Sequence, residues 1–139
     1  MLLHLPIKLL LAGAASCICM AASAQRDVVL CNNIASLQMT AGNNWLSMPI
    51  INISDDTPIN ICFDDLTHVY HRYAYRLQHC EADWSPSEGI FDTDYCDGFA
   101  DGDIIDSYAK SVNTNTIYTH YSLSIPNDRC RLKMSGNYR

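Results

Sequence analysis

The chain has few basic side chains: nine lysines and arginines stand against 15 aspartates and glutamates, which gives a formal net charge of −6. These basic residues are scattered and form no stripe along the sequence. An acidic surface repels the phosphates of nucleic acids and anionic lipid headgroups. The sequence therefore excludes nucleic-acid binding, whereas acidity by itself keeps a domain soluble and names no partner.

The chain also lacks a long hydrophobic run. Its apolar stretch at Leu9–Ala15 is much shorter than the roughly 20 residues that a membrane-spanning helix needs. The stretch follows Lys8 and precedes the small residues Ala22–Ala24, which is the pattern of a secretory signal peptide. We predict a cleaved signal peptide over residues 1–24, export to the periplasm, and one domain over residues 25–139.

Two alternatives remain open at this end of the chain. A lipoprotein would carry its lipid on Cys17, which follows Ala14-Ala15-Ser16, although a bulkier apolar residue is usual three places earlier. A buried N-terminal helix would have to tolerate Pro6 and Gly13, which interrupt any amphipathic pattern.

Helical periodicity is missing as well, because no segment keeps a period of 3.6 residues over three turns. Repeats and low-complexity tracts are also lacking. Short β-branched and aromatic segments separated by turn residues instead predict an all-β protein, an immunoglobulin-like sandwich. The expected strands cover residues 34–39, 48–53, 59–63, 70–79, 117–125 and 130–134. The segment between Trp84 and Asn113 is irregular and rich in aspartate, so we expect a long surface excursion there.

The predicted mature region has an odd number of cysteines: Cys31, Cys62, Cys80, Cys96 and Cys130. Export permits disulfides, but an odd number leaves at least one thiol free or paired with another chain. The cysteines lack the short paired spacing of a zinc ribbon. We expect most of them to be small hydrophobic residues buried on strands. The sequence does not reveal which cysteines pair.

Catalytic and zinc sites are both weakly indicated. His79 and Cys80 are neighbours on a strand and point to opposite faces, so His79 cannot easily accept the proton of the Cys80 thiol. A zinc set could combine them with His68 and His71, but nothing fixes enough ligands. The adjacent acids Asp64 and Asp65 likewise face opposite ways and do not make a glycosidase pair.

A calcium loop is a further alternative, suggested by Asp92, Asp94 and Asp97 before Gly98. It departs from the usual pattern because the fifth place is Cys96, the glycine comes one position late, and Asp103 stands where glutamate is usual. We therefore expect a solvated acidic loop. Eight tyrosines and two tryptophans could instead form a sugar-binding platform, although packing at alternating strand positions explains most of them.

Several unusual strings occur in a fixed order between Ile34 and Tyr138. They are Phe63-Asp64-Asp65-Leu66, His79-Cys80-Glu81-Ala82-Asp83-Trp84-Ser85-Pro86-Ser87, Tyr95-Cys96-Asp97-Gly98-Phe99, Asn113-Thr114, Tyr118-Thr119-His120-Tyr121, Ile125-Pro126-Asn127 and Ser135-Gly136-Asn137-Tyr138. Together they resemble the N-terminal region of the type IX secretion system plug proteins of Bacteroidota. Resembling proteins continue further, so we expect the β-sandwich to be incomplete at the C-terminus.

The resemblance implies a non-enzymatic protein that binds the periplasmic side of the outer-membrane translocon barrel and closes its pore. It implies no catalytic, cofactor-binding or metal-binding residues, no small-molecule substrate, and no integral membrane segment. Within the domain, the acidic segment Gly89–Asp106 is our hypothesis for the contact with the translocon. The alternative function is that of an exported carbohydrate-binding module.

Overall fold

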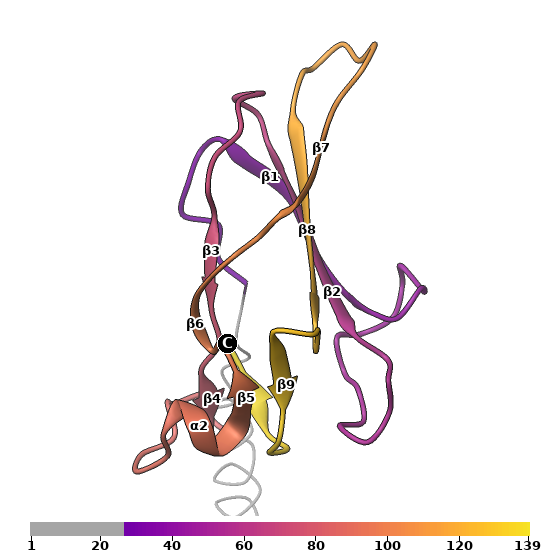
Figure 1. The fold of residues 1–139 in the computed structure, drawn as a ribbon. Helices are drawn as coiled ribbons and strands as arrows, with labels where there is room; N and C mark the ends of the chain where they lie inside the picture. The colour runs from indigo at the N-terminus through magenta and orange to yellow at the C-terminus, as the bar shows by residue number, and fades with distance from the viewer. Residues whose placement is uncertain (1–26) are drawn as a thin grey trace, which may run out of the picture.

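The computed structural model describes residues 27–139, and the predicted signal peptide, including Cys17, lies outside them. Within this range the chain consists of short strands and one turn of helix, α2 (Asp92–Tyr95). All the strand pairs are antiparallel. The prediction of an all-β protein is therefore confirmed, as Figure 1 shows.

A four-stranded sheet with the order β1-β2-β8-β7 forms one layer. Its strands are β1 (Ile34–Ala41), β2 (Ile59–Asp65), β8 (Thr119–Ile125) and β7 (Ser107–Lys110). The central strands β2 and β8 pair over their whole length, from Ile59 opposite Ile125 to Asp65 opposite Thr119. Along β8, apolar or aromatic residues alternate with polar ones, so that Tyr121, Leu123 and Ile125 are buried on one face. This alternation directs one side of the sheet toward the core.

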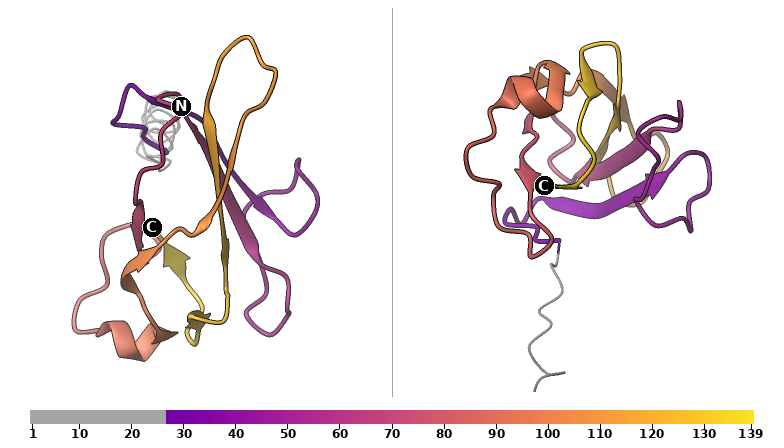
Figure 2. Two further views of the ribbon diagram at one scale, coloured as in Figure 1. Left: turned by 45° about the horizontal axis from the view of Figure 1, so that its top comes forward. Right: turned by 90° about the horizontal axis from the view of Figure 1, so that it is seen from below.

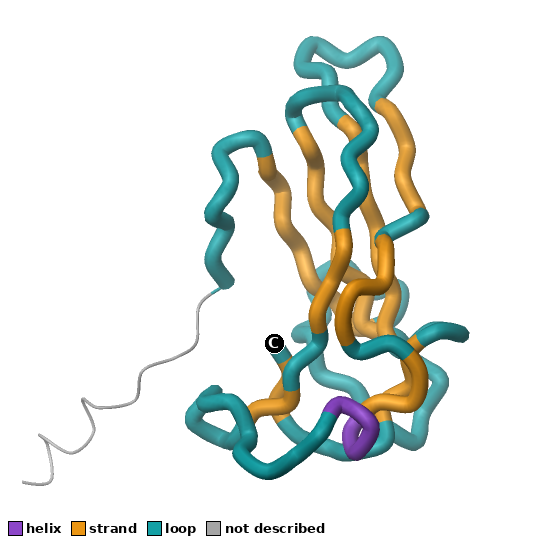
Figure 3. The backbone as a smooth tube through the Cα atoms, turned by 60° about the vertical axis from the view of Figure 1, so that its left-hand side comes forward, coloured by secondary structure: helices purple, strands orange, loops and turns teal. Residues whose placement is uncertain are grey.

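Three short strand pairs form the second layer. Their strands are β3 (Ala74–Arg76) with β6 (Asp101–Ile104), β4 (His79–Cys80) with β10 (Asn137–Tyr138), and β5 (Cys96–Gly98) with β9 (Cys130–Leu132). Figure 2 shows β3 and β6 across from the four-stranded sheet, and Figure 3 shows α2 at one end of the described part of the chain. The arrangement is sandwich-like, as the sequence predicts.

Aromatic rings join the two layers. Phe63 of β2 and Tyr121 of β8 stack with their ring centroids 5.3 Å apart. Tyr73, which precedes β3, meets both rings edge-on at 5.1 and 4.9 Å. Edge-to-face and offset-stacked pairs at these distances add stability beyond that of the buried area. The rest of the buried core consists of Tyr95, Cys96, Ala100, Ile105, Leu123, Ile125 and Cys130.

Four predicted strands are confirmed, with small shifts at their ends, as β1, β2, β8 and β9. The segment predicted as one strand over residues 70–79 is divided into β3 and the start of β4. Tyr73, Tyr75 and Leu77, which occupy alternate positions in this segment, pack against the core. Ile117, the first residue of the predicted strand 117–125, precedes β8 and is 55% exposed.

Two expectations are wrong. Residues 48–53 do not form a strand; they lie in the connection between β1 and β2, where sheet pairing ends at Ala41 opposite Ile59. The segment between Trp84 and Asn113 is not irregular, since it contains α2, β5, β6 and β7, but most of its residues are exposed, as expected. Short strands with glycine and aspartate carry little alternation, so their pairing depends on tertiary contacts that the local pattern does not reveal.

Strand β1 contains an irregularity near its beginning. Ala35 lies opposite Asp64 and Gln38 lies opposite Cys62, so β1 has one more residue than β2 between these two pairs. Ser36 has a φ of 56° within this stretch. An extra residue on one strand bends that strand and interrupts its ladder. This bulge lies on an edge strand of the four-stranded sheet.

Candidate functional site

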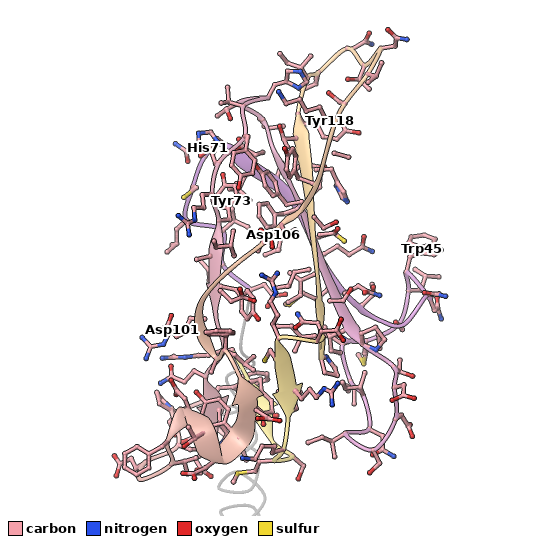
Figure 4. All side chains as sticks on the ribbon, in the orientation of Figure 1. Trp45, His71, Tyr73, Asp101, Asp106 and Tyr118 are labelled. Atoms are coloured by element: carbon pink, nitrogen blue, oxygen red, sulfur yellow. The ribbon has the colours of Figure 1, made fainter. Side chains whose placement is uncertain are left out.

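Several exposed apolar side chains lie close in sequence on the connection between β1 and β2. We name residues 43–53 the apolar β1–β2 loop. Its large apolar side chains are mostly in solvent, with exposed fractions of 71% for Trp45, 73% for Leu46, and 74% for both Met48 and Ile50. Figure 4 shows Trp45 on a loop that projects from the body of the protein. Exposed apolar side chains of this kind make the loop a candidate interaction surface.

Polar contacts fix the base of this loop. The Ser47 hydroxyl accepts a hydrogen bond from the Ala41 amide at 2.8 Å and donates one to the Ala41 carbonyl at 2.7 Å. The Gln38 side chain donates to the Trp45 carbonyl at 3.0 Å. The loop is thus anchored to β1 while its apolar side chains stay outside the core. The apolar pattern predicts a strand over residues 48–53 and therefore does not indicate this surface.

The acidic segment Gly89–Asp106, our predicted contact, is built into the fold. Tyr95, Cys96, Ala100 and Ile105 are all buried in the core. The Tyr95 hydroxyl lies 2.9 Å from the Leu77 carbonyl oxygen and 2.5 Å from the Asp92 carboxylate, so it can donate its hydrogen to either acceptor. The segment therefore forms much of the second layer, which limits how much of it a partner can reach.

Most of the acids in this segment have partners within the chain. Arg129 binds Asp103 and Asp106, each at 3.0 Å, and Arg76 lies 3.7 Å from Asp101. Asp94 accepts a hydrogen bond from the Phe91 amide at 2.8 Å, which closes the first turn of α2. Figure 4 shows Asp101 and Asp106 well apart along the segment. The carboxylates thus point to different partners and do not converge as calcium ligands would.

The proposed zinc and thiol residues are also held by separate partners. His68 lies 3.1 Å from the Tyr118 carbonyl, and His71 lies 2.6 Å from the Asp65 carboxylate. His79 contacts the Ser87 hydroxyl at 2.8 Å through Nδ1, and the buried Cys80 thiol donates to the Gln78 carbonyl at 3.7 Å. Across residues 27–139, no three histidine, cysteine or acidic side chains gather as a metal site.

Asp65 is the centre of a buried polar cluster at the end of β2. Its carboxylate is fully buried and accepts hydrogen bonds from Asn33 at 3.2 Å, from the Thr67 amide at 2.9 Å and from the Tyr73 hydroxyl at 2.9 Å. Burial acts to raise the pKa of Asp65, but these hydrogen bonds to the charged form outweigh it and hold the pKa well below its ordinary value. Burial and the same carboxylate raise the pKa of Tyr73 to about 12. Figure 4 shows His71 and Tyr73 side by side at this cluster.

Many residues of the unusual strings meet at the β4–β10 pair. The His79 ring packs edge-on against Tyr138 at 5.2 Å. Gly136 lies directly beneath this ring, where an added Cβ would come within 2.2 Å of His79 Nε2. The Asn137 side chain donates to the Glu81 carbonyl at 3.0 Å. These residues therefore hold two distant parts of the chain together, and packing explains why they occur.

The tyrosines face inward more than a sugar-binding platform would require. Tyr95 and Tyr121 are buried, and Tyr73, Tyr75 and Tyr138 are packed against the core. Their hydroxyl groups donate to partners within the chain, as Tyr75 does to Asp103 at 3.1 Å. Burial comes first among the causes that raise the pKa of Tyr75, followed by nearby Cys130 and Asp103. This arrangement does not favour the carbohydrate-binding alternative.

Comparison with known proteins agrees with the resemblance in the sequence. Residues 34–139 match the family described as the type 9 secretion system plug protein first domain. The chain belongs to this family. The plug family is a structural, non-catalytic kind of domain that works within a secretion system. No helix within residues 27–139 has the length and apolar character needed to cross a bilayer.

The fold is shared with a solved structure. A crystal structure of a hypothetical protein from Parabacteroides merdae ATCC 43184 superimposes with a TM-score of 0.74 at 40% sequence identity. The match covers 78% of this chain and 27% of that chain, so this chain spans about a quarter of its relative. No protein in the curated collection matches the chain.

Proposed function

We propose that this plug-family domain is a non-enzymatic periplasmic protein that binds the outer-membrane translocon barrel of the type IX secretion system and closes its pore. The observation that carries the proposal is the family match over residues 34–139. An acidic domain with no basic stripe has no nucleic-acid partner, and the proposal requires no small-molecule substrate.

The mechanism we propose is occlusion by a rigid body. Two layers joined by the rings of Phe63, Tyr73 and Tyr121 resist deformation, because close-packed interiors have low compressibility. Loops that project from such a body determine what it contacts. The apolar β1–β2 loop is the best candidate for that contact, because a fully buried interface core is more apolar than the ordinary protein surface.

Co-purification with the translocon tests this assignment. Replacing Trp45, Leu46, Met48 and Ile50 together by serine removes the apolar contact while leaving the core untouched, and we expect recovery of the complex to fall at least tenfold. A matched control replaces Val112 and Ile117 by serine, since they are 76% and 55% exposed on the loop between β7 and β8. Equal recovery of the two variants would remove the apolar β1–β2 loop from consideration.

The acidic segment Gly89–Asp106 remains a rival contact surface. Asp97 and Phe99 are both exposed there, so Asp97→Lys combined with Phe99→Ser changes the surface without breaking an ion pair of Arg129. We expect this double variant to co-purify normally. A loss confined to this variant would move the contact to the acidic segment, and normal recovery of every variant would contradict both assignments.

The proposal also requires export. We propose that residues 1–24 are removed, so that the mature protein begins at Gln25, and that it lies at the inner side of the outer membrane. N-terminal sequencing of protein from a periplasmic fraction should give Gln25. A chain that begins at a lipid-modified Cys17 would show membrane anchoring instead, and recovery of the uncleaved chain from the cytosol would contradict the proposal.

A further inference from the structure

Two buried cysteines meet between the short strands of the second layer. Cys96 begins β5 and Cys130 begins β9, and their Sγ atoms lie 3.0 Å apart. Their exposed fractions are 3% and 0%. A disulfide bond measures about 2.0 Å, so the two sulfur atoms are roughly an ångström from bonding distance.

The pairing of β5 with β9 explains this approach. Cys96 lies opposite Leu132 and Cys130 lies opposite Gly98, so the two cysteines are diagonal neighbours on one face of the ladder. Diagonal side chains remain within reach of one another across an antiparallel pair. Gly98 brings the backbones close, since an added Cβ there would come within 2.1 Å of the Arg129 carbonyl oxygen. Two distant segments of the chain thus place both sulfur atoms at one point in the core.

The other described cysteines lie in different surroundings. Cys31 is exposed and Cys62 is half-buried. Cys80 is as buried as the close pair, but its thiol donates to the Gln78 carbonyl at 3.7 Å. Cys96 and Cys130 are therefore the pair of described cysteines that the structure brings together, and a bond between them would leave Cys31, Cys62 and Cys80 as thiols.

We propose that Cys96 and Cys130 form a disulfide bond in the mature protein. The two thiols lose two protons and two electrons as the Sγ–Sγ bond forms, and the disulfide of an oxidant, a thiol–disulfide oxidoreductase, is reduced to two thiols. The reacting species is a thiolate. Burial, followed by the nearby Cys96 thiol, raises the pKa of Cys130 to about 12 in the folded domain. The exchange therefore takes place during folding, before β5 and β9 enclose the sulfur atoms.

Peptide mapping of the purified full chain tests the bond. The protein is reduced, unfolded, and refolded in a buffer of reduced and oxidised glutathione, and free thiols are then alkylated. Trypsin releases Cys130 by cutting after Arg129, and a glutamate-specific protease cuts at Glu81 and Glu88 to separate Cys80 from Cys96. We expect a linked pair of peptides that contains Cys96 and Cys130 and lacks Cys80.

A stability measurement supplies an independent readout. The separation of 34 residues between the cysteines predicts, by chain entropy, that oxidation raises the folding equilibrium constant on the order of 600-fold. Reductant should lower the urea midpoint of the wild type and of the matched control Cys80→Ala by the same amount. The double variant Cys96→Ala/Cys130→Ala should show no response to reductant.

Three results would overturn the proposal: alkylation of both Cys96 and Cys130 after refolding, a stable glutathione adduct on either one, or a link from either one to Cys80. The mapping is done on the wild-type chain, so it does not depend on whether a cysteine variant folds. It also needs no translocon, and its result is therefore independent of the proposed function.

Discussion

Replacing Gly98 by alanine should weaken the contact between β5 and β9. Gly98 has a φ of 104°, a backbone conformation that residues other than glycine rarely adopt. The new Cβ would come within 2.1 Å of the Arg129 carbonyl oxygen and 2.9 Å of its carbon. Because both atoms belong to the backbone, no side-chain rotation relieves the overlap. The two strands must move apart by about an ångström, and the hydrogen bond from the Phe99 amide to the Arg129 carbonyl, 2.8 Å long, would be stretched.

The magnitude follows from two parts. An unfavourable backbone conformation costs about 1–3 kcal/mol, and the overlap with loss of a hydrogen bond adds about 2 kcal/mol. Gly102→Ala is the matched control, because Gly102 has a φ of 78° but nothing lies within 4 Å of an added Cβ. It experiences the backbone penalty alone. We therefore expect Gly98→Ala to lower the free energy of unfolding by about 2 kcal/mol more than Gly102→Ala does.

Urea unfolding followed by tryptophan fluorescence measures this difference. The slope of free energy against urea concentration should be the same in both variants, so that the midpoints compare stability directly. Equal midpoints for Gly98→Ala and Gly102→Ala would refute the reasoning, because they would show that the strands do not approach as closely as the structure indicates.

Three further substitutions probe the buried clusters by the same unfolding assay. Asp65→Asn should cost about 3 kcal/mol at neutral pH. Because the pKa of Asp65 is lowered in the folded state, its carboxylate stabilises the fold above the ordinary pKa of 3.8, and this contribution is lost as the pH falls from 3.8 toward the lowered pKa. The difference should therefore shrink over that range, and a constant difference would contradict the charge argument. Gly136→Ala should lower the free energy of unfolding by about 2 kcal/mol. The loss should be smaller in a His79→Ala background, where the new Cβ of residue 136 meets no imidazole ring. Additive effects of the two substitutions would count against the overlap. Tyr121→Phe should cost about 1–3 kcal/mol because its hydroxyl bonds both the amide and the carbonyl of His71, at 2.8 and 3.1 Å; a neutral effect would show that water replaces it.

The long central strands could be predicted from the sequence because their patterns are local. β8 alternates between the buried Tyr121, Leu123 and Ile125 and more exposed neighbours. β2 is rich in β-branched and aromatic residues. Such segments carry their own inward face, and they pair with each other over seven residues each. Local pattern and tertiary pairing point to the same structure in these strands.

The second layer could not be predicted in this way. β5 (Cys96–Gly98) and β6 (Asp101–Ile104) have three and four residues, too few to show an alternation. Their position depends on partners distant in the sequence, such as Arg129, which joins Asp103 to Asp106. A segment rich in aspartate has the composition of a solvated loop. Its own sequence does not reveal that Arg129, some 25 residues later, forms ion pairs with Asp103 and Asp106.

The apolar β1–β2 loop could not be predicted because its local pattern is strong but misleading. The run from Met48 to Ile53 has the apolar composition of a strand, but it pairs with no strand among residues 27–139, so most of its large side chains remain in solvent. Composition indicates how strongly a segment avoids water, and it does not say whether the partner that covers it belongs to the same chain. Two earlier residues, Trp45 and Leu46, extend the same apolar surface.

The bulge in β1 makes the two margins of the main sheet unequal. The margin formed by β1 is bent near Ser36, which makes it a poor template for docking an additional polypeptide. The opposite margin, β7 (Ser107–Lys110), pairs with β8 without an interruption, and all its residues are exposed. The two edges therefore differ as sites for an added strand: a strand from another molecule would meet regular backbone geometry at β7, beside Tyr108 and Ala109, and a distorted backbone at β1.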